Sequence, residues 1–300
     1  MARLDEIEAF CLTVERGNFT RAAKALGVTP QAASRAVGRL EERLGVELLR
    51  RNTRHVAVST HGRQYYDACR RALDLLGDAE ARLGTAAGVV AGAVRISVPT
   101  TYGHHRFLPL LVGFRRRFPA VRLEVQVDNR NVDFVRDGFD LAVRMGTLDD
   151  GGFIARRLGD FDLGVFASPD YLARRGTPTT PDGLMAHDCA VFVMPRTGRA
   201  LPWTFVPGPE ALAPPAALRV RQDILGIVTF ARSGGGIIQT YRFMVEAELA
   251  RGELVEILSD FAGRARPFSL IYPREAAARP PVRALIDYVL DATRGDRNSG

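Results

Sequence analysis

Apolar residues recur at helical spacing near the N-terminus. Intervals of four, three and four residues predict one apolar face on a helix that begins at Pro30. The residues of this face are Ala33, Val37, Leu40 and Leu44. The Thr29 hydroxyl suits the N-cap of that helix, and proline suits its first position because no backbone N–H is needed there. A shorter helix capped by Asn18 precedes it and Gly27 fits the turn between the two, so the segment is typical of a helix-turn-helix.

A first helix over residues 3–16 has an apolar face that would close the small core of this domain. The members of that face are Leu4, Ile7, Phe10, Cys11 and Val14. The polar face of the helix after Pro30 carries Gln31, Ser34, Arg35, Gly38 and Arg39. Because the second helix of a helix-turn-helix enters the major groove, this face predicts DNA binding. The alternative interpretation is an ordinary helical hairpin whose arginines are solvated.

Residues 48–59 are typical of two short strands joined by a basic turn. The basic residues around that turn are Arg50, Arg51, Arg54 and His55. A hairpin beside a recognition helix would lay such arginines along the phosphates or into the minor groove. Residues 1–61 contain ten basic and seven acidic side chains, and four of the acids lie in the first helix. We expect that helix to face away from the DNA, so the charge of the domain is polarised.

Residues 1–62 resemble the winged helix-turn-helix domain of LysR-type transcriptional regulators. The resemblance rests on the stretch GNFTRAAKALGVTPQAASRAVGRLEERLGVELLRR, on TRHVAVS and on the pair His61-Gly62. The sequence departs from the family at Leu49, where phenylalanine is usual, and at Val58-Ser59, where leucine and threonine are usual. Neither departure touches the polar face. The residues expected to contact DNA are Thr29, Pro30, Gln31, Ser34, Arg35, Arg39, Arg51 and Arg54.

Residues 61–84 form a further predicted helix, with apolar residues at heptad-like intervals. The seam consists of Tyr65, Cys69, Ala72, Leu76, Ala79 and Leu83. It predicts a dimerisation helix that separates paired DNA-binding domains, and resemblance to the family implies the same. The alternative is an amphipathic helix that packs on its own domain. The sequence leaves homodimer and homotetramer open.

Beyond a glycine-containing stretch that predicts a hinge, residues 85–92, strands alternate with helices. Predicted strands cover residues 93–99, 121–127, 140–146, 161–168, 188–194, 217–220, 235–240 and 267–273. Predicted helices cover residues 105–119, 131–138, 222–234 and 280–293. This alternation predicts an α/β fold with mostly parallel sheets. Its division into two sets predicts two lobes with a cleft between them, as in periplasmic binding proteins.

Matches to the LysR-type family cover nearly all of the second half of the chain. They include VRDGFDLAVRMG, ASPDYL and RSGGGII, and the resemblance implies a two-lobed α/β effector-binding domain. The expected organisation is a DNA-binding domain over residues 1–60, a linker helix and hinge over 61–91, and an effector-binding domain over 92–300. Lobe I would hold about residues 92–162 and 267–300, and lobe II about residues 163–266.

The effector is expected in the cleft, because ligands of open α/β sheets bind beyond the carboxyl ends of the strands. The residues expected to line it are Thr100, Thr101, Tyr102, Asp128, Asn129, Arg144, Met145, Pro195, Trp203, Asp223 and Ile224. Hydroxyls beside a helix N-terminus favour a small carboxylate or another polar metabolite. Asp128 would select a hydroxyl or an amine on that ligand, unless its side chain caps the next helix instead.

Composition narrows the classes of function. The chain has a net charge of +7, which suits a polyanionic partner, and it contains no run of 18 apolar residues. The acidic residues of its N-terminus do not fit a signal peptide, so we expect a cytoplasmic protein with no membrane partner. Three cysteines without a CxxC pair are expected to be buried or incidental thiols.

The sequence shows no motif for catalysis, for a metal or for a cofactor. His104 and His105 are adjacent and cannot face one metal ion from a helix. The function we favour is a DNA-binding transcriptional regulator that a small-molecule effector modulates, with RNA polymerase as a further candidate partner. One alternative is a DNA-binding architectural protein or repressor without a ligand response. Another is an enzyme or solute-binding protein with an accessory N-terminal domain.

Overall fold

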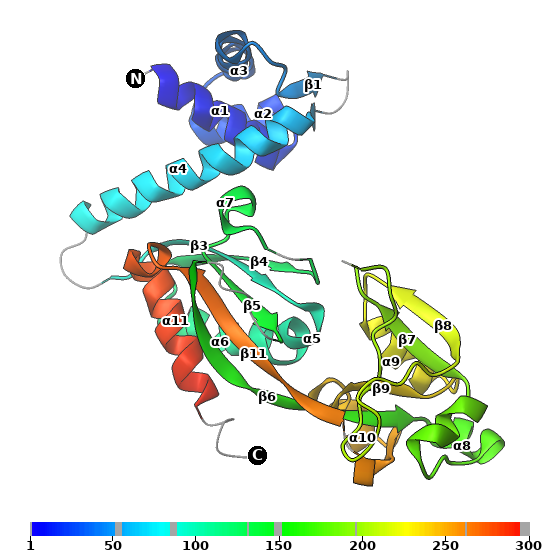
Figure 1. Ribbon diagram of the computed structural model, residues 1–300. Coiled ribbons are helices and arrows are strands. Elements are labelled where there is room, and N and C mark those ends of the chain that lie inside the picture. The colour runs from blue at the N-terminus through cyan, green and yellow to red at the C-terminus, as the bar shows by residue number, and fades with distance from the viewer. Residues whose placement is uncertain are drawn as a thin grey trace. The chain divides into compact units, whose positions relative to one another are not determined.

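The computed structural model describes residues 2–51, 56–84, 89–130, 132–146, 152–195, 197–261 and 263–294 (Figure 1). The chain divides into two compact units. One unit is formed by Met1–Ala93 with the short segment Val135–Gly138, and the other by Val94–Phe134 and Phe139–Gly300. The N-terminal unit therefore contains both the predicted DNA-binding domain and the predicted linker helix.

The N-terminal unit is a three-helix domain with a β-hairpin and a long fourth helix. Its elements are α1 (Ala2–Arg16), α2 (Phe19–Leu26), α3 (Pro30–Leu44), β1 (Leu49–Arg51), β2 (Val56–Val58) and α4 (Thr60–Gly84). β1 and β2 pair antiparallel, as the two strands of a wing do. The tip of the predicted wing, residues 52–55 with Arg54, lies outside the described residues.

The helix boundaries follow the local chemistry that the sequence predicts. The Asn18 side chain accepts a hydrogen bond from the Arg21 amide at 2.8 Å, and Thr29 accepts one from the Ala32 amide at 3.2 Å. Gly27 ends α2 with a φ of 69°, a left-handed conformation that glycine adopts without strain. These caps fix the tight turn that precedes α3.

The core of the N-terminal unit lies between α1, α3, the wing and the start of α4. Its buried residues are Ala9, Phe10, Cys11, Ala36, Val37, Leu40, Leu48, Leu49 and Cys69. The expected burial of Leu4 was wrong, because this residue is 47% exposed while Glu6 is buried on the same helix. All three cysteines, Cys11, Cys69 and Cys189, are free and buried.

The first turns of α4 belong to this core, which corrects the predicted dimerisation seam. Tyr65 packs against the core and Cys69 is 6% exposed, so the domain itself uses the first two residues of the seam. Leu75 and Leu76 are 53% and 46% exposed. The large apolar side chains left open on the described part of α4 are therefore these two leucines.

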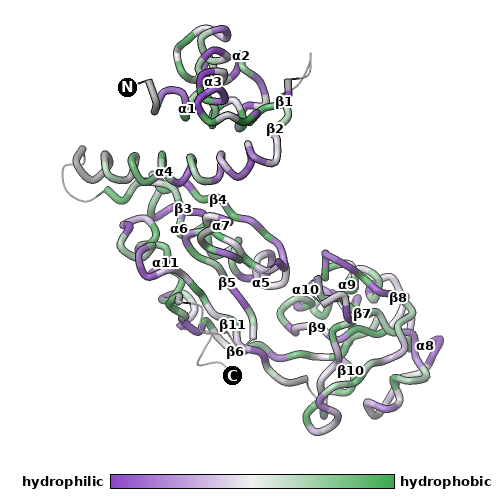
Figure 2. The backbone as a smooth tube through the Cα atoms, turned by 45° about the horizontal axis from the view of Figure 1, so that its top comes forward, coloured by the Kyte–Doolittle hydropathy of each residue, from purple (hydrophilic) through white to green (hydrophobic). Residues whose placement is uncertain are grey.

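Hydrophobic and hydrophilic residues alternate along the coloured part of α4 (Figure 2). Among the described residues, no helix is both long enough and apolar enough to cross a membrane.

The rest of the chain alternates strands with helices. The strands are β3 (Gly92–Val98), β4 (Val121–Val127), β5 (Leu141–Met145), β6 (Phe153–Ala167), β7 (Cys189–Val193), β8 (Ala216–Arg221), β9 (Ile238–Tyr241), β10 (Val255–Ile257) and β11 (Gly263–Pro273). The α-helices are α5 (Thr100–Tyr102), α6 (Leu108–Arg117), α7 (Phe134–Asp137), α8 (Pro169–Arg175), α9 (Leu225–Arg232), α10 (Glu246–Ala250) and α11 (Pro280–Thr293). A π-helical turn (Gly103–Phe107) joins α5 to α6, and short 3-10 helices cover Pro181–Ala186, Arg242–Met244, Ser259–Phe261 and Ala276–Ala278.

The main sheet of the C-terminal unit has the order β10-β6-β11-β5-β3-β4, with β9 also paired to β6. β3 and β5 are parallel, but β11 is antiparallel to both β5 and β6. The prediction of mostly parallel sheets was therefore wrong for the two long strands. Residues 153–160, where no strand was expected, extend β6 to 15 residues. β6 and β11 lie side by side and run from lobe I into lobe II (Figure 1).

Lobe II has a smaller sheet in which β7 and β8 pair parallel, with α9 packed on it. Its core is built from Val165, Ala167, Tyr171, Leu184, Cys189, Val191, Trp203, Phe205, Ile237 and Ile257. The main sheet extends into lobe II, where β9 and β10 pair with the second half of β6, and the strands β6 and β11 thus connect the two lobes.

Candidate functional site

The outer face of α3 presents most of the residues expected to contact DNA. Thr29, Pro30, Gln31, Arg35 and Arg39 are exposed, and Ser34 is half-buried. The opposite side of the helix is buried through Ala33, Val37 and Leu40. The side chain of Arg51 and the whole of Arg54 lie outside the described part of the chain.

A buried carboxylate from α1 contacts this face, which corrects the expectation that the acids of the first helix lie away from it. Glu6 Oε1 lies 3.0 Å from Arg39 Nε, and Glu6 Oε2 lies 3.4 Å from Arg43 Nη2. Glu6 is only 6% exposed. The Arg39 side chain remains 56% exposed, so it is held at one end and open to solvent at the other.

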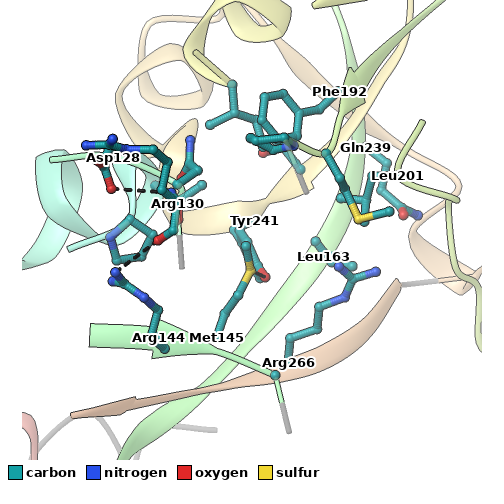
Figure 3. Close-up of a pocket in the computed structure, with 18 of the residues that line it drawn as sticks. Asp128, Arg130, Arg144, Met145, Leu163, Phe192, Leu201, Gln239, Tyr241 and Arg266 are labelled. Atoms are coloured by element: carbon teal, nitrogen blue, oxygen red, sulfur yellow. Dashed lines mark hydrogen bonds and ion pairs between the residues drawn. The ribbon is translucent and has the colours of Figure 1, made fainter. Parts of the chain in front are cut away.

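A pocket of about 550 Å³ lies between the two lobes of the C-terminal unit (Figure 3). The expected effector residues that line it are Thr101, Asp128, Asn129, Arg144, Met145, Pro195 and Ile224. In lobe I these residues follow or end β3, β4 and β5, and in lobe II they follow β7 and precede α9. The carboxyl ends of neighbouring strands thus meet at one edge, as the strand-end rule requires.

Two aromatic residues expected in the cleft belong to the protein core instead. The Tyr102 ring is 2% exposed and packs edge-on against Phe161 and stacks on Phe268. Trp203 is 3% exposed within the core of lobe II. Their large apolar rings are better buried than solvated, and this preference prevailed over their position beside the predicted cleft.

Two polar residues expected in the cleft are used locally and do not line the pocket. Thr100 Oγ1 accepts a hydrogen bond from Asn129 Nδ2 at 3.0 Å. Asp223 Oδ1 accepts one from the Leu225 amide at 3.0 Å, so its side chain closes a turn just before α9.

The wall contributed by β6, β9 and β11 was missed from the sequence. The lining residues that the sequence did not indicate are Arg130, Leu163, Phe192, Leu201, Gln239, Thr240, Tyr241, Arg266 and Pro267. Pro99, Gly146 and Met194, which adjoin expected residues at the strand ends, also line the pocket. Two predicted strands stopped one residue short of important positions. The predicted strand 235–240 omits Tyr241, and the predicted strand 267–273 omits Arg266.

The Asp128 carboxylate is held by its own neighbours. Its Oδ2 accepts hydrogen bonds from Gln126 Nε2 at 2.6 Å and from Arg130 Nε at 2.8 Å, and its Oδ1 accepts one from the Arg130 amide at 3.3 Å. Asp128 therefore caps a turn and not the helix α7. Burial acts to raise the pKa of Asp128, but these hydrogen bonds and the Arg130 charge outweigh burial and lower it.

Asn129 and Arg144 are engaged as well. Asn129 Nδ2 donates to the Gln222 carbonyl at 3.1 Å, which links lobe I to lobe II. Arg144 Nη2 donates to the Ser97 hydroxyl at 2.8 Å and to the Arg130 carbonyl at 3.1 Å. These bonds hold the Arg144 guanidinium against the wall of the pocket.

The polar residues of lobe II also have protein partners. Gln239 Oε1 accepts from the Thr204 amide at 3.0 Å, and Gln239 Nε2 donates to the Thr204 carbonyl at 2.8 Å. The Tyr241 hydroxyl donates to Met145 Sδ at 3.1 Å. Burial raises the pKa of Tyr241 to about 12, although the nearby Arg266 acts in the opposite direction. The phenol is therefore neutral at physiological pH.

Two lining groups differ from these, the Thr101 hydroxyl and the Arg266 guanidinium. Thr101 is 1% exposed, and its Oγ1 has no hydrogen-bond partner. Arg266 extends from β11 beside Leu163 and Tyr241 (Figure 3), and no carboxylate among the described residues pairs with it. A buried polar group without a partner costs about 1–3 kcal/mol, so the Thr101 hydroxyl favours a ligand that supplies its missing hydrogen bond. The half-buried Arg266 guanidinium, which meets only the Tyr241 phenol among the interactions of the described residues, favours a ligand with a negative charge. The pocket offers that ligand one hydroxyl and one positive charge.

Within the described ranges, no group of three or more His, Cys, Asp or Glu side chains could hold a metal ion. His105 has a buried Nε2 atom without a hydrogen-bond partner among the described residues. Burial, aided by the neighbouring His104, lowers the pKa of His105.

Comparisons with known proteins agree with both halves of the chain. Residues 4–63 match the family described as "Bacterial regulatory helix-turn-helix protein, lysR family", and residues 87–294 match "LysR substrate binding domain". The HTH-type transcriptional regulator CrgA of Neisseria meningitidis serogroup C is 31% identical over 291 residues, which cover 96% of each chain.

Solved structures of full-length relatives have the same fold. CrgA from Neisseria meningitidis aligns with a TM-score of 0.62 at 30% identity, over 96% of this chain and 98% of that one. The Vibrio cholerae virulence activator AphB aligns with a TM-score of 0.63 at 25% identity, over the same shares of the two chains.

The fold and the two sites define a transcriptional regulator with separate DNA-binding and ligand-binding domains. This chain belongs to the LysR family of transcriptional regulators. Its N-terminal helix-turn-helix domain binds DNA, and its C-terminal two-lobed α/β domain binds an effector.

Proposed function

We propose that this regulator reads operator DNA with the outer face of α3 and responds to a small anionic metabolite held between the lobes of its C-terminal unit. Base edges would be contacted by Gln31, Ser34, Arg35 and Arg39, phosphates near the helix start by Thr29 and Pro30, and phosphates along the wing by Arg51 and Arg54. The support is that Thr29, Pro30, Gln31, Arg35 and Arg39 are exposed at the start and on the outer face of α3, with the half-buried Ser34 among them. Arginine and glutamine are also the side chains that make bidentate contacts with guanine and adenine.

The observation that supports an anionic effector is the combination of an unpaired hydroxyl and an uncompensated positive charge in the pocket. The Thr101 hydroxyl lacks a hydrogen-bond partner, and within the described part of the chain the charge of Arg266 is met by a neutral phenol and by no carboxylate. Leu163 and Phe192 supply apolar wall for the body of the ligand. A pocket of about 550 Å³ suits a small metabolite. We set aside an amine-selecting role for Asp128, because Arg130 neutralises its charge.

We propose that the protein acts as a homodimer, with a tetramer as the larger assembly, through the exposed apolar residues of α4. Leu75 and Leu76 lie on this helix beyond the part that packs on the domain core. RNA polymerase is the further partner we propose for a DNA-bound regulator. Since its target is chromosomal DNA, we place the protein in the cytoplasm. Catalysis has no role in this proposal.

The test is thermal unfolding of the full chain in the presence of small carboxylates and of their uncharged amide counterparts. We expect one or more carboxylates to raise the melting temperature while the matching amides do not, because only the acid meets the Arg266 charge. Thr101→Val and Arg266→Gln should each weaken the affinity for such a carboxylate by about tenfold or more.

The matched control for Arg266→Gln is Arg274→Gln. Arg274 follows the same strand, is exposed, and has no interaction with another described residue. The control should bind the carboxylate as the unmodified chain does. If the carboxylate stabilises both the Thr101→Val and the Arg266→Gln chains as strongly as the original, the ligand binds elsewhere and the proposed site is wrong.

A further inference from the structure

The Glu6 carboxylate is buried in the protein, where a charge is unfavourable. It lies on α1 and is 6% exposed, and a buried carboxylate is costly unless it is paired and hydrogen-bonded. Both of its oxygens are used, one by Arg39 at 3.0 Å and the other by Arg43 at 3.4 Å. Both arginines come from α3, so a single buried group on one helix fixes two side chains of another.

The two arginines belong to one stripe of α3. Gln31, Arg35, Arg39 and Arg43 follow one another at intervals of four residues, which places them on the same side of a helix. Among the described residues, Gln31 and Arg35 have no acidic partner: the Arg35 Nε atom makes a long contact of 3.4 Å to the Gln31 carbonyl. Glu6 therefore acts on the second half of the stripe.

The geometry of the pair leaves Arg39 able to bind a further group. Glu6 takes the Nε atom of Arg39, and the Arg39 side chain is still 56% exposed. An arginine side chain in solution loses substantial rotamer freedom when it is fixed on a ligand. Because Glu6 fixes the Nε end beforehand, part of that loss is incurred during folding and not during DNA binding.

We propose that Glu6 is a positioning residue for DNA recognition, which orients Arg39 on the surface of α3 before DNA is bound. The proposal rests on the role proposed above for the outer face of α3. For the change in DNA affinity when Glu6 is replaced, this proposal predicts the opposite sign to simple electrostatics. Removing a negative charge near a DNA-binding surface should strengthen binding to every duplex. Removing an orienting group should instead weaken binding to the operator in particular.

The experiment uses the full chain and a duplex that the unmodified chain selects from a randomised pool, with a shuffled duplex as the non-specific probe. Glu6→Gln keeps the size of the side chain and removes its charge. We expect it to reduce the ratio of operator affinity to shuffled-duplex affinity by about tenfold. Glu8→Gln is the matched control, because Glu8 lies exposed on the same helix and makes no hydrogen bond or ion pair with another described residue. This control should leave the ratio unchanged.

A double-mutant cycle shows whether Glu6 acts through Arg39. In an Arg39→Ala background, Glu6→Gln should no longer change the ratio, since the side chain it orients is gone. Glu6→Asp keeps the charge and withdraws the carboxylate by one methylene group, so it should lower the ratio even if Glu6→Gln proves too unstable to purify. Each variant is used only where thermal unfolding shows a folded N-terminal domain.

The outcomes separate this proposal from the one on which it rests. If the unmodified chain selects no duplex, or if Arg39→Ala binds the operator normally, the proposed role of Arg39 in DNA recognition by α3 is wrong. If Arg39→Ala weakens operator binding but Glu6→Gln and Glu6→Asp keep the original ratio, only the positioning role of Glu6 is wrong.

Discussion

Arginine is used in two different ways in the two units of this protein. On α3, Arg39 shares a buried carboxylate with Arg43 and still reaches solvent. In the pocket of the C-terminal unit, Arg266 lies beside the neutral phenol of Tyr241 and has no carboxylate partner among the described residues. In the first arrangement the positive charge of Arg39 points outward to solvent. In the second, the positive charge of Arg266 stays available for an anion that enters the pocket.

The difference follows from the two kinds of ligand. DNA brings many phosphates to an exposed surface where water screens each charge, so direction matters more there than the size of the charge. A small anion brings one charge into a partly apolar space, where an uncompensated guanidinium interacts more strongly. A carboxylate beside Arg266 would neutralise the pocket, whereas a carboxylate beside Arg39 orients a side chain.

The largest effect should come from removing the DNA-binding surface altogether. A Cβ atom at Gly62 would collide with the Leu48 carbonyl, and both residues are buried where α4 meets the wing. Gly62→Ala should therefore destabilise the N-terminal domain by several kcal/mol, about 3 or more. We expect operator binding to be lost while carboxylate binding to the C-terminal unit persists, as two-probe thermal unfolding would show.

Gly77→Ala is the control for this change. Gly77 lies on the same helix, and a Cβ there meets nothing within 4 Å. Alanine is a better helix former, so this variant should keep or slightly raise stability. If Gly62→Ala abolishes carboxylate binding as well, the two sites are not independent, and the comparison between them loses its basis.

Assembly should give the next largest effect. Leu76 is 46% exposed on α4, and Leu76→Arg places a charge on the apolar surface proposed to pair two copies. We expect monomers in equilibrium sedimentation and operator binding weaker by about a hundredfold, because a dimer holds two half-sites at once. Carboxylate binding should not change. An intact dimer in this variant would remove the leucines of α4 from the interface.

Losing a single base contact should weaken operator binding less than losing the dimer. Arg35→Ala should weaken operator binding by about tenfold to a hundredfold and relax the preference at one base pair. Lys24 is exposed on α2 and makes no hydrogen bond or ion pair with another described residue. Lys24→Ala removes its positive charge, so it should weaken binding to all duplexes slightly and alike. Fluorescence anisotropy with operator and shuffled duplexes distinguishes these results, and equal losses in the two variants would count against base recognition by Arg35.

The smallest effect concerns the ion pair between Asp128 and Arg130 in the pocket wall. The folded-state pKa of Asp128 lies below its ordinary value of 3.8, so the ionised group stabilises the fold above that pH. This contribution is lost as the pH falls below 3.8 through the lowered pKa. Asp128→Asn should cost less than about 1 kcal/mol at neutral pH and should flatten the acid limb of stability. Urea unfolding at neutral and acidic pH would measure both, and an unchanged acid limb would contradict the assignment.

The sequence predicted the N-terminal domain well because its signals are local. Asn18, Gly27 and Thr29 each act on neighbours within three or four residues, and α3 begins at Pro30 as expected. Two elements of the C-terminal half also have the predicted bounds, β4 at residues 121–127 and α11 at residues 280–293. Residues placed by local hydrogen bonds or by a long amphipathic pattern can be recognised without knowledge of the fold.

The pocket could be predicted only in part, because its walls come from segments far apart in the chain. The ends of β3, β4 and β5 were found by the strand-end rule, but Arg266 and Tyr241 were missed. They lie on the antiparallel strands β11 and β9, which pair with β6. The ion pair between Glu6 and Arg39 was missed for a related reason. It joins residues 33 positions apart, and no local pattern marks a buried carboxylate.

The most direct test of the account is operator binding with and without a stabilising carboxylate, compared between the unmodified chain and Arg266→Gln. Fluorescence anisotropy should give the same operator affinity for both proteins when no carboxylate is present, because Arg266 belongs to the C-terminal pocket. Adding the carboxylate at a fixed concentration should shift the operator affinity of the unmodified chain and leave that of Arg266→Gln in place. An equal shift in both proteins would contradict the claim that Arg266 recognises the effector.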